Sequence, residues 1–257
     1  MLTIKKNKDI KLDIPKFTCD TNCVGSHLEE HPFTQLLNVY GFLCIIGKPG
    51  SGKTSLAISF MTQSNPKIYK KAAHHMIILM PQNSINSLKK NPFKKLKDIY
   101  HELNQSTINE IHNKIDEYSK NDEKTILFVD DMTADLKNVE VRTILKKLIF
   151  NRRHLKLNII ITAQVYNNLP MDIRKNITSL IMFKCQKKEL ENVFDELFEN
   201  KKDKFMEVMR ICYKNKNDFL FLNIASQRMF KNFDEIIIND SDNESDNETI
   251  INNKLIN

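Results

Sequence analysis

The sequence lacks long hydrophobic runs, and this absence limits the kind of protein it can be. The longest purely aliphatic stretches are three or four residues, as in Ile159–Ile161. A membrane-spanning helix needs about 20 predominantly apolar residues, so we expect no transmembrane segment. The first 14 residues alternate Lys and Asp with Ile and contain no apolar core of a secretory signal. We therefore expect no cleaved signal peptide either.

Cysteine is also sparse. Five cysteines are an odd number in a chain without a secretory signal, so we expect reduced thiols rather than a disulfide framework. Hydrophobic residues make up 41% of the 257 residues and charged residues 28%. This composition is typical of a soluble globular chain that is long enough to form a substantial core.

Glycine is scarce and unevenly placed. Only five of the 257 residues are glycine, which is about 2% against a usual frequency of about 7%. Three of them, Gly47, Gly50 and Gly52, fall within six positions. Because glycine tolerates backbone conformations and close approaches that other residues do not, this cluster indicates backbone that bends sharply or lies against a ligand.

Charge is distributed unevenly along the chain. The formal net charge is +7, but residues 235–257 hold six acids and one lysine, so residues 1–234 carry a net charge of +12. A body this basic suggests a polyanionic partner, with nucleic acid as the first candidate. A lysine-rich composition inherited from an AT-rich genome explains the same numbers. Residues 239–248 contain no apolar side chain and five acids, so we expect them to be disordered.

Short apolar runs rich in β-branched residues recur through the chain and predict strands. Segments whose apolar residues repeat at helical spacing separate most of them. This alternation indicates an α/β fold with a mostly parallel central sheet and helices on both faces. The expected strands are 42–46, 76–80, 125–129, 157–162, 179–183 and 219–224, and the expected helices are 106–118, 139–150, 187–198 and 203–213.

The glycine cluster lies in a phosphate-binding motif. Gly47-Lys48-Pro49-Gly50-Ser51-Gly52-Lys53-Thr54 fits G-x-x-x-x-G-K-[ST] in full, with a strand-like run before it and a helical run after it. Successive backbone N–H groups of such a loop surround a β-phosphate at a helix N-terminus. The ammonium of Lys53 is expected to bridge the β- and γ-phosphates, and the hydroxyl of Thr54 to ligate Mg²⁺.

Two carboxylates end the third expected strand of the P-loop region. Asp130 and Asp131 follow the apolar run 126–129, as in a Walker B motif. Asp130 is expected to hold Mg²⁺ directly or through water, and Asp131 to orient or deprotonate the attacking water. A solvated strand end or a helix cap is the plainer interpretation of both residues.

Two further features flank the next strand. Gln164 follows the expected strand 157–162, where an amide senses the γ-phosphate and holds the attacking water; an ordinary loop glutamine is the alternative. Arginine is rare, at six residues against 33 lysines, yet Arg152 and Arg153 are adjacent. They precede a strand of about 20 Å, so they lie at the sheet edge opposite their own nucleotide. We expect arginine fingers that act on a neighbouring subunit, or else a basic pair that ends a helix.

In this order and spacing, the motifs resemble those of the FtsK/HerA-type P-loop ATPases, and within them the genome-packaging ATPases of poxviruses, other large DNA viruses and virophages. The resemblance covers roughly residues 31–224. Asp131 departs from the cellular members, which typically carry Glu there, whereas the viral branch accepts Asp more readily. The matching segments are His31–Phe33, Gly47–Ser55, Ile126–Asp131, Asn151–Gln164 and Leu169–Asn176.

The resemblance implies an ATPase of the additional-strand (ASCE, RecA-like) class with strand order 5-1-4-3-2. It also implies a homo-oligomeric ring that threads double-stranded DNA into a preformed capsid, acts with capsid or portal proteins and works at virus assembly sites in host cytoplasm or in association with the virion. We expect a lead-in over residues 1–40, the ATPase domain over 41–234 and an acidic tail over 235–257. The resemblance adds Ser55 to the nucleotide-binding residues.

Other functions and sites remain open from the residues alone. One alternative is a nucleoside or nucleotide kinase, which needs an arginine-bearing lid, but residues 76–124 contain no arginine. Another is a non-catalytic nucleotide-binding scaffold, in which Asp131 and Gln164 would have no catalytic role. A GTPase is disfavoured because no glycine has Asp three residues before it. Lys89–Lys97 either contacts DNA phosphates or is a solvated loop. The metal-ligand types Cys19, Cys23, His27 and His31 recur every four residues, which is not the usual zinc-finger spacing.

Overall fold

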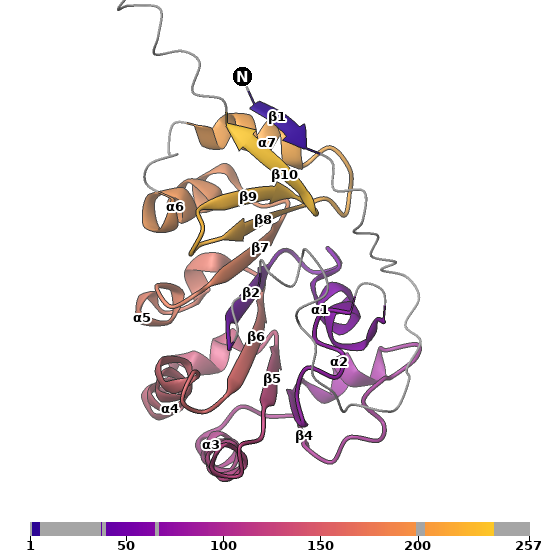
Figure 1. Cartoon of the computed structure of the whole chain (residues 1–257), viewed down its shortest axis with the longest axis vertical. Coiled ribbons are helices and arrows are strands. Elements are labelled where there is room, and N and C mark those ends of the chain that lie inside the picture. Colours follow the sequence, from indigo (N-terminus) through magenta and orange to yellow (C-terminus); the bar gives the residue numbers. More distant parts are fainter. Residues whose placement is uncertain (1, 6–36, 38–39, 65–66, 199–203, 239–257) are drawn as a thin grey trace, which may run out of the picture.

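The computed structural model describes residues 2–5, 37, 40–64, 67–198 and 204–238, which form a ten-stranded sheet with helices on both faces (Figure 1). The strand order is β1-β10-β9-β8-β7-β2-β6-β5-β3-β4. The parallel strands are β2 (Phe42–Ile46), β3 (His75–Leu79), β4 (Ile99–Tyr100), β5 (Thr125–Asp130), β6 (Leu157–Ala163) and β7 (Ser179–Phe183). The antiparallel strands are β8 (Phe219–Asn223), β9 (Arg228–Lys231), β10 (Asp234–Ile238) and β1 (Leu2–Lys5).

The centre of this sheet confirms the predicted fold class. Counted along the chain, the first five expected strands are β2, β3, β5, β6 and β7, and their order in the sheet is β7-β2-β6-β5-β3. This is the order 5-1-4-3-2 that the resemblance implied. It places the first strand between the fourth and the fifth, so the loop after β2 lies beside the end of β6.

The sequence of the central strands explains why they are covered on both faces. Every residue of β2, β5, β6 and β7 is buried, as expected of parallel strands between two helical layers. Successive side chains of a strand point to opposite faces. Phe42, Cys44 and Ile46 accordingly pack in one hydrophobic cluster, and Leu43 and Ile45 in the other.

The helices divide between the two faces (Figure 1). In α3, Ile108, Ile111 and Ile115 are buried as the spacing predicts, and the Asn104 side chain caps the helix by accepting from the N–H of Thr107 at 2.9 Å. One face carries α1 (Lys53–Thr62) and α2 (Gln82–Asn86). The other carries α3 (Gln105–Lys120), α4 (Val139–Asn151), α5 (Met171–Arg174), α6 (Lys187–Leu197) and α7 (Phe205–Cys212).

The antiparallel end of the sheet corrects one expected boundary. The acidic tail was predicted to begin at residue 235, but that position lies inside β10. Composition misled the prediction there, because Glu235 counts as one of the acids yet pairs with Arg228 of β9 at 2.7 Å, while Ile236 is buried. The predicted lead-in likewise contributes a strand, since β1 pairs with β10 from Leu2↔Ile238 to Lys5↔Glu235.

Some predictions fall outside the described residues. Cys19, Cys23, His27 and His31 lie there, as does the acidic segment 239–248. Cys44, Cys185 and Cys212 are free thiols. Among the described residues, no three metal-ligand side chains gather into a potential metal site, and no helix combines the length and apolar character needed to cross a bilayer.

Candidate active site

The P-loop connects the end of β2 to the start of α1, and its glycines are required by the backbone. Gly50 has φ +73° and Gly52 φ +104°, values that favour glycine. Gly47 has a different reason: a Cβ there would lie 2.8 Å from the Cβ of Phe183 on β7. The N–H of Gly47 also donates to the carbonyl of Ala163 at 3.1 Å, which fixes the loop beside the end of β6.

The P-loop holds a buried ammonium and a buried hydroxyl. Lys53 is only 7% exposed, and its ammonium reaches the carbonyl of Lys48 at 3.3 Å. Burial lowers the pKa of Lys53, while the charges of Asp131 and Asp130 act in the opposite direction. The hydroxyl of Ser51 is buried without a hydrogen-bond partner. Such groups suit a bound polyphosphate, which would satisfy the buried hydroxyl and pair with the ammonium.

Asp130, at the end of β5, accepts two hydroxyl hydrogen bonds on one oxygen. Thr54 of α1 donates to its Oδ1 at 2.8 Å, and Thr162 of β6 donates to the same atom at 2.7 Å. Asp130 is 2% exposed, and burial raises its pKa although both hydrogen bonds oppose that shift. The hydroxyl of Thr54 and this carboxylate are hard oxygen ligands of the kind that Mg²⁺ takes, so the residues present fit that ion.

The burial of Asp130 yields a testable effect on stability. A carboxyl whose pKa is higher in the folded than in the unfolded state destabilises the fold at every pH above both values, and the penalty vanishes below the ordinary value of 3.8. We therefore expect Asp130→Asn to raise the melting temperature of the nucleotide-free protein near neutral pH. The advantage should shrink as the pH falls through the raised pKa. Differential scanning calorimetry across this range measures it, and a variant that melts below wild type near neutral pH would contradict it.

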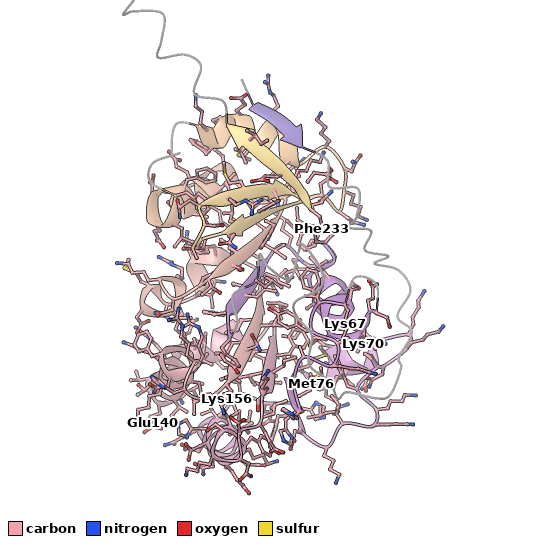
Figure 2. The ribbon with its side chains drawn as sticks, in the orientation of Figure 1. Lys67, Lys70, Met76, Glu140, Lys156 and Phe233 are labelled. Atoms are coloured by element: carbon pink, nitrogen blue, oxygen red, sulfur yellow. The ribbon has the colours of Figure 1, made fainter. Side chains whose placement is uncertain are left out.

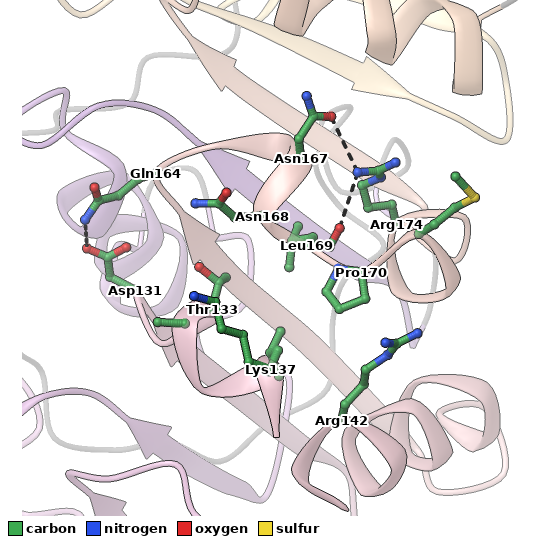
Figure 3. A pocket seen from close by; sticks show the side chains of 13 residues that line it. Asp131, Thr133, Lys137, Arg142, Gln164, Asn167, Asn168, Leu169, Pro170 and Arg174 are labelled. Atoms are coloured by element: carbon green, nitrogen blue, oxygen red, sulfur yellow. Dashed lines mark hydrogen bonds between the residues drawn. The ribbon is translucent and has the colours of Figure 1, made fainter. Parts of the chain in front are cut away.

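Asp131 and Gln164 lie side by side at the carboxyl ends of β5 and β6. The Nε2 of Gln164 donates to Oδ2 of Asp131 at 2.7 Å (Figure 3). Asp131 has φ +54°, an uncommon conformation for a residue other than glycine and one that clusters at functional sites. Its N–H donates to the hydroxyl of Thr162 at 3.0 Å, which holds this backbone in place. Sequence reasoning predicted Asp131 and Gln164 separately, but it did not find Thr162, which contacts both Walker B carboxylate residues.

The turn after Gln164 is hydrogen-bonded to two glutamates of α6 that the sequence analysis did not identify. In this turn, η3 (Tyr166–Asn168), the N–H of Tyr166 donates to Oε1 of Glu189 at 2.5 Å. The hydroxyl of Tyr166 donates to Glu196 at 2.8 Å. Glu196 also accepts two hydrogen bonds from Arg174, at 3.1 Å from Nε and 2.5 Å from Nη2. The rarity of arginine could have drawn attention to Arg174, but no sequence signal identifies its partner.

The pair formed by Arg174 and Glu196 predicts a large loss of stability when it is broken. Arg174 is only 8% exposed, so Glu196→Ala leaves a buried guanidinium uncompensated, which costs about 3 kcal/mol. We expect the free energy of unfolding in a urea titration to fall by that amount. Glu191→Ala, on the same helix, is the control and should change it by less than about 0.5 kcal/mol. Equal values for the two variants would refute the role given to Glu196.

A polar cavity of about 630 Å³ opens beside Asp131 and Gln164 (Figure 3). It is bounded by η2 (Thr133–Lys137), η3, α5 and the first turns of α4. Two of its arginines already have carboxylate partners: Arg142 pairs with Asp172 at 3.0 Å, and Arg174 pairs with Glu196. The cavity therefore offers amides and hydroxyls beside the carboxylate of Asp131, together with the exposed Lys137.

The two adjacent arginines differ in their surroundings. Arg152 follows α4, is partly buried, and donates from Nη1 to the carbonyl of Ile149 at 2.8 Å. Burial is the main cause that lowers its pKa, and the charge of Arg153 adds to it. Arg153 is exposed. Both precede β6, and Gln164 follows it, so the seven residues of β6 separate the pair from Asp131 and Gln164 of the same chain.

Solved structures with a similar fold support the interpretation of this architecture. The genome-packaging NTPase B204 of Sulfolobus turreted icosahedral virus 2, in complex with ATP-γS, matches with a TM-score of 0.56 and 14% identity over 75% of this chain and 97% of that one. B204 of Sulfolobus turreted icosahedral virus gives 0.55 and 17% over 79% and 100%. The pCW3 conjugation coupling protein TcpA gives 0.54 and 16% over 76% and 61%. At these identities the likeness shows the fold.

Sequence comparison supplies the family. A comparison with curated proteins gives no match. The model of one protein family, described as the Poxvirus A32 protein, matches residues 29–257. The match includes the P-loop, both Walker B carboxylates, Gln164 and the arginine pair, and it agrees with the resemblance inferred from the motifs. The chain belongs to the Poxvirus A32 protein family.

Proposed function

We propose that this chain is an ATP-hydrolysing translocase that packages double-stranded viral DNA into a preformed capsid. The observation that carries the proposal is the junction of Asp130, Asp131 and Gln164 at the ends of two adjacent strands beside a complete P-loop. Membership of the Poxvirus A32 family supports the assignment. The fold shared with genome-packaging NTPases supports it as well.

The proposed reaction is in-line attack of water on the γ-phosphorus of ATP. A bond forms between the water oxygen and phosphorus while the bond to the β–γ bridging oxygen breaks, giving ADP and inorganic phosphate. Asp131 accepts the proton of the water, and the amide of Gln164, which now donates to Asp131 at 2.7 Å, orients that water. Lys53 neutralises charge on the β- and γ-phosphates.

The remaining P-loop residues bind and orient the nucleotide. The backbone N–H groups of the segment 47–55 surround the phosphates at the N-terminus of α1. Thr54 and Asp130, whose oxygens lie 2.8 Å apart, would hold Mg²⁺, which supplies charge neutralisation on the phosphates when bound. The polyphosphate would also give the buried hydroxyl of Ser51 the partner that it lacks.

The arginine pair supports a site completed by a second copy of the chain. Arg153 is exposed at the sheet edge opposite its own P-loop. In a heterologous ring, one edge of each subunit faces the other edge of its neighbour. Arg153 then contacts the γ-phosphate of the adjacent subunit, where a guanidinium stabilises the charge of the transition state. Arg152 holds the end of α4 and so positions its neighbour.

A nucleotide kinase is the alternative, and the cavity beside Asp131 would be its acceptor pocket. An anionic acceptor requires free cations there. Arg142 and Arg174 are already paired with Asp172 and Glu196, which leaves Lys137 of the residues that line the cavity. One exposed lysine is little support for a pocket that must hold an anionic acceptor. The proposed partners are duplex DNA, further copies of the chain, and capsid or portal proteins, and the proposed place of action is the virus assembly site in the host cytoplasm or the virion.

The test is the rate of ATP hydrolysis with and without linear duplex DNA, measured by phosphate release. We expect duplex DNA to raise kcat severalfold, and a random-sequence duplex to act as well as any other because phosphate contacts carry no sequence information. A rate that ignores DNA would refute the motor. Phosphate transfer to an added nucleoside or nucleotide in place of release would support the kinase.

A further inference from the structure

Five exposed lysines gather on the segment that connects β3 to β4. They fall within a span of nine positions, and residues 82–97 contain no acid. Within the described part of the chain, none of the five side chains makes an ion pair or a hydrogen bond, so their charges are not neutralised internally. The five residues, named here the lysine surface, are Lys89, Lys90, Lys94, Lys95 and Lys97.

The backbone beneath these lysines is well anchored. Phe93, in the middle of the segment, is 1% exposed and packs against Phe128 of β5 with ring centroids 6.5 Å apart. Asn91 accepts from the N–H of Phe93 at 2.8 Å, and the N–H of Leu96 donates to the carbonyl of Phe93 at 2.8 Å. The apolar side chains point into the core, so the segment presents an ordered cationic platform rather than a solvated loop.

The same face of the sheet carries further lysines. The segment after α1 packs into the same hydrophobic cluster as Phe93, through Ile68 and Tyr69, and bears the partly exposed Lys67 and Lys71. Figure 2 shows Lys67 on the side of the molecule where α1 and α2 lie. The helix α3 lies on the other face, and its acids Glu110 and Asp116 are paired with lysines of the same helix.

The chemistry of this surface fits the phosphates of duplex DNA. A lysine ammonium contacts a phosphate as a point charge that does not depend on base sequence. The apolar core of a protein interface or an inserted membrane anchor would in addition need apolar side chains to bury. The large exposed hydrophobic residues among those described all lie elsewhere, at Val139, Phe150, Val165, Met171, Met206 and Ile237.

We infer that the lysine surface is a duplex-DNA contact of this chain. The inference rests on the proposed function, which requires that the motor hold DNA. It adds the part of the surface that makes this contact. The platform also packs against the strand that carries the catalytic carboxylates, because Phe128 lies on β5 two residues before Asp130.

The test uses the full chain and the salt dependence of binding to a random-sequence duplex, measured by fluorescence anisotropy. Two double variants remove the charges, Lys89→Gln with Lys90→Gln and Lys94→Gln with Lys95→Gln. The matched control is Lys214→Gln with Lys216→Gln, two exposed lysines before β8. Each lost phosphate contact reduces the slope of log K against log salt by about 0.9. Each double variant should lose up to about 1.8 from the slope, which is about thirtyfold in affinity at 0.15 M salt.

The outcomes separate this inference from the function on which it rests. Loss of slope in the two double variants and not in the control supports the lysine surface, provided that melting temperatures stay within a degree or two of wild type, as expected for exposed substitutions. If wild type binds duplex DNA and both double variants bind it with the same slope, the lysine surface is wrong and the motor stands. If wild type itself shows no salt-dependent binding, the proposed function fails.

Discussion

Replacing Asp131 with Asn should lower kcat for ATP hydrolysis by about 10²- to 10⁴-fold, the range that general base catalysis contributes. Asp131 accepts a hydrogen bond from Gln164 at 2.7 Å and takes the proton of the attacking water in the proposed reaction. The amide of Asn keeps the size of the side chain but cannot accept that proton. Steady-state phosphate release at saturating ATP measures the effect.

The control for this variant lies four residues further along. Asp135 is an exposed carboxylate in η2, and Asp135→Asn should leave the rate within about twofold of wild type, because it touches neither the P-loop nor Gln164. The affinity for ATP-γS should be nearly unchanged in Asp131→Asn, since the lost step belongs to the chemistry and not to binding. An Asp131→Asn enzyme that keeps the wild-type kcat would remove Asp131 from the mechanism.

Replacing Arg153 with Ala should lower kcat by about 10³-fold or more, the contribution of an arginine finger. Arg153 is exposed and far from its own Gln164, so its loss should leave the nucleotide affinity of the separate subunit and its melting temperature almost unchanged. Phosphate release and thermal unfolding, measured on the same preparation, separate the two effects. Arg153→Lys should recover little, because lysine lacks the bidentate fork.

Arg152→Ala is the comparison that distinguishes the pair. Its guanidinium donates to the carbonyl of Ile149 at the end of α4 and is partly buried. We expect Arg152→Ala to lower the melting temperature, and to lower activity only through the position of Arg153. If Arg152→Ala abolishes hydrolysis without loss of stability while Arg153→Ala remains active, the roles of the two arginines are exchanged.

The fold could be predicted where the sequence is locally informative. The runs 42–46, 125–129, 157–162 and 179–183 are apolar nearly throughout, and parallel strands between two helical layers favour that pattern. The helical period of 106–118 was as clear, and the observed helix extends it by only one or two residues at each end. The P-loop could be predicted because its backbone conformation and close contacts require glycine, so the motif is visible in the sequence itself.

What the sequence did not reveal depends on contacts between distant segments. The pairing of β1 with β10 joins residues at opposite ends of the chain. The alternation of β1 is only four residues long, and β10 has none. The hydrogen bonds that Tyr166 donates to Glu189 and Glu196 connect a turn to residues of a helix more than 20 positions further along the chain. Nothing in the sequence distinguishes Thr162 from other strand residues, and its role depends on the hydrogen bond that its hydroxyl donates to Asp130.

The central claim is that each copy of the chain completes the ATPase site of its neighbour. The most direct measurement mixes Arg153→Ala with Asp131→Asn subunits under conditions that allow exchange, and follows phosphate release with duplex DNA. Each variant alone is expected to be inactive. In a random one-to-one ring, about a quarter of the interfaces pair an intact Asp131 with an intact Arg153, so the mixture should recover up to about a quarter of the wild-type rate. A mixture as inactive as its two components would contradict the account.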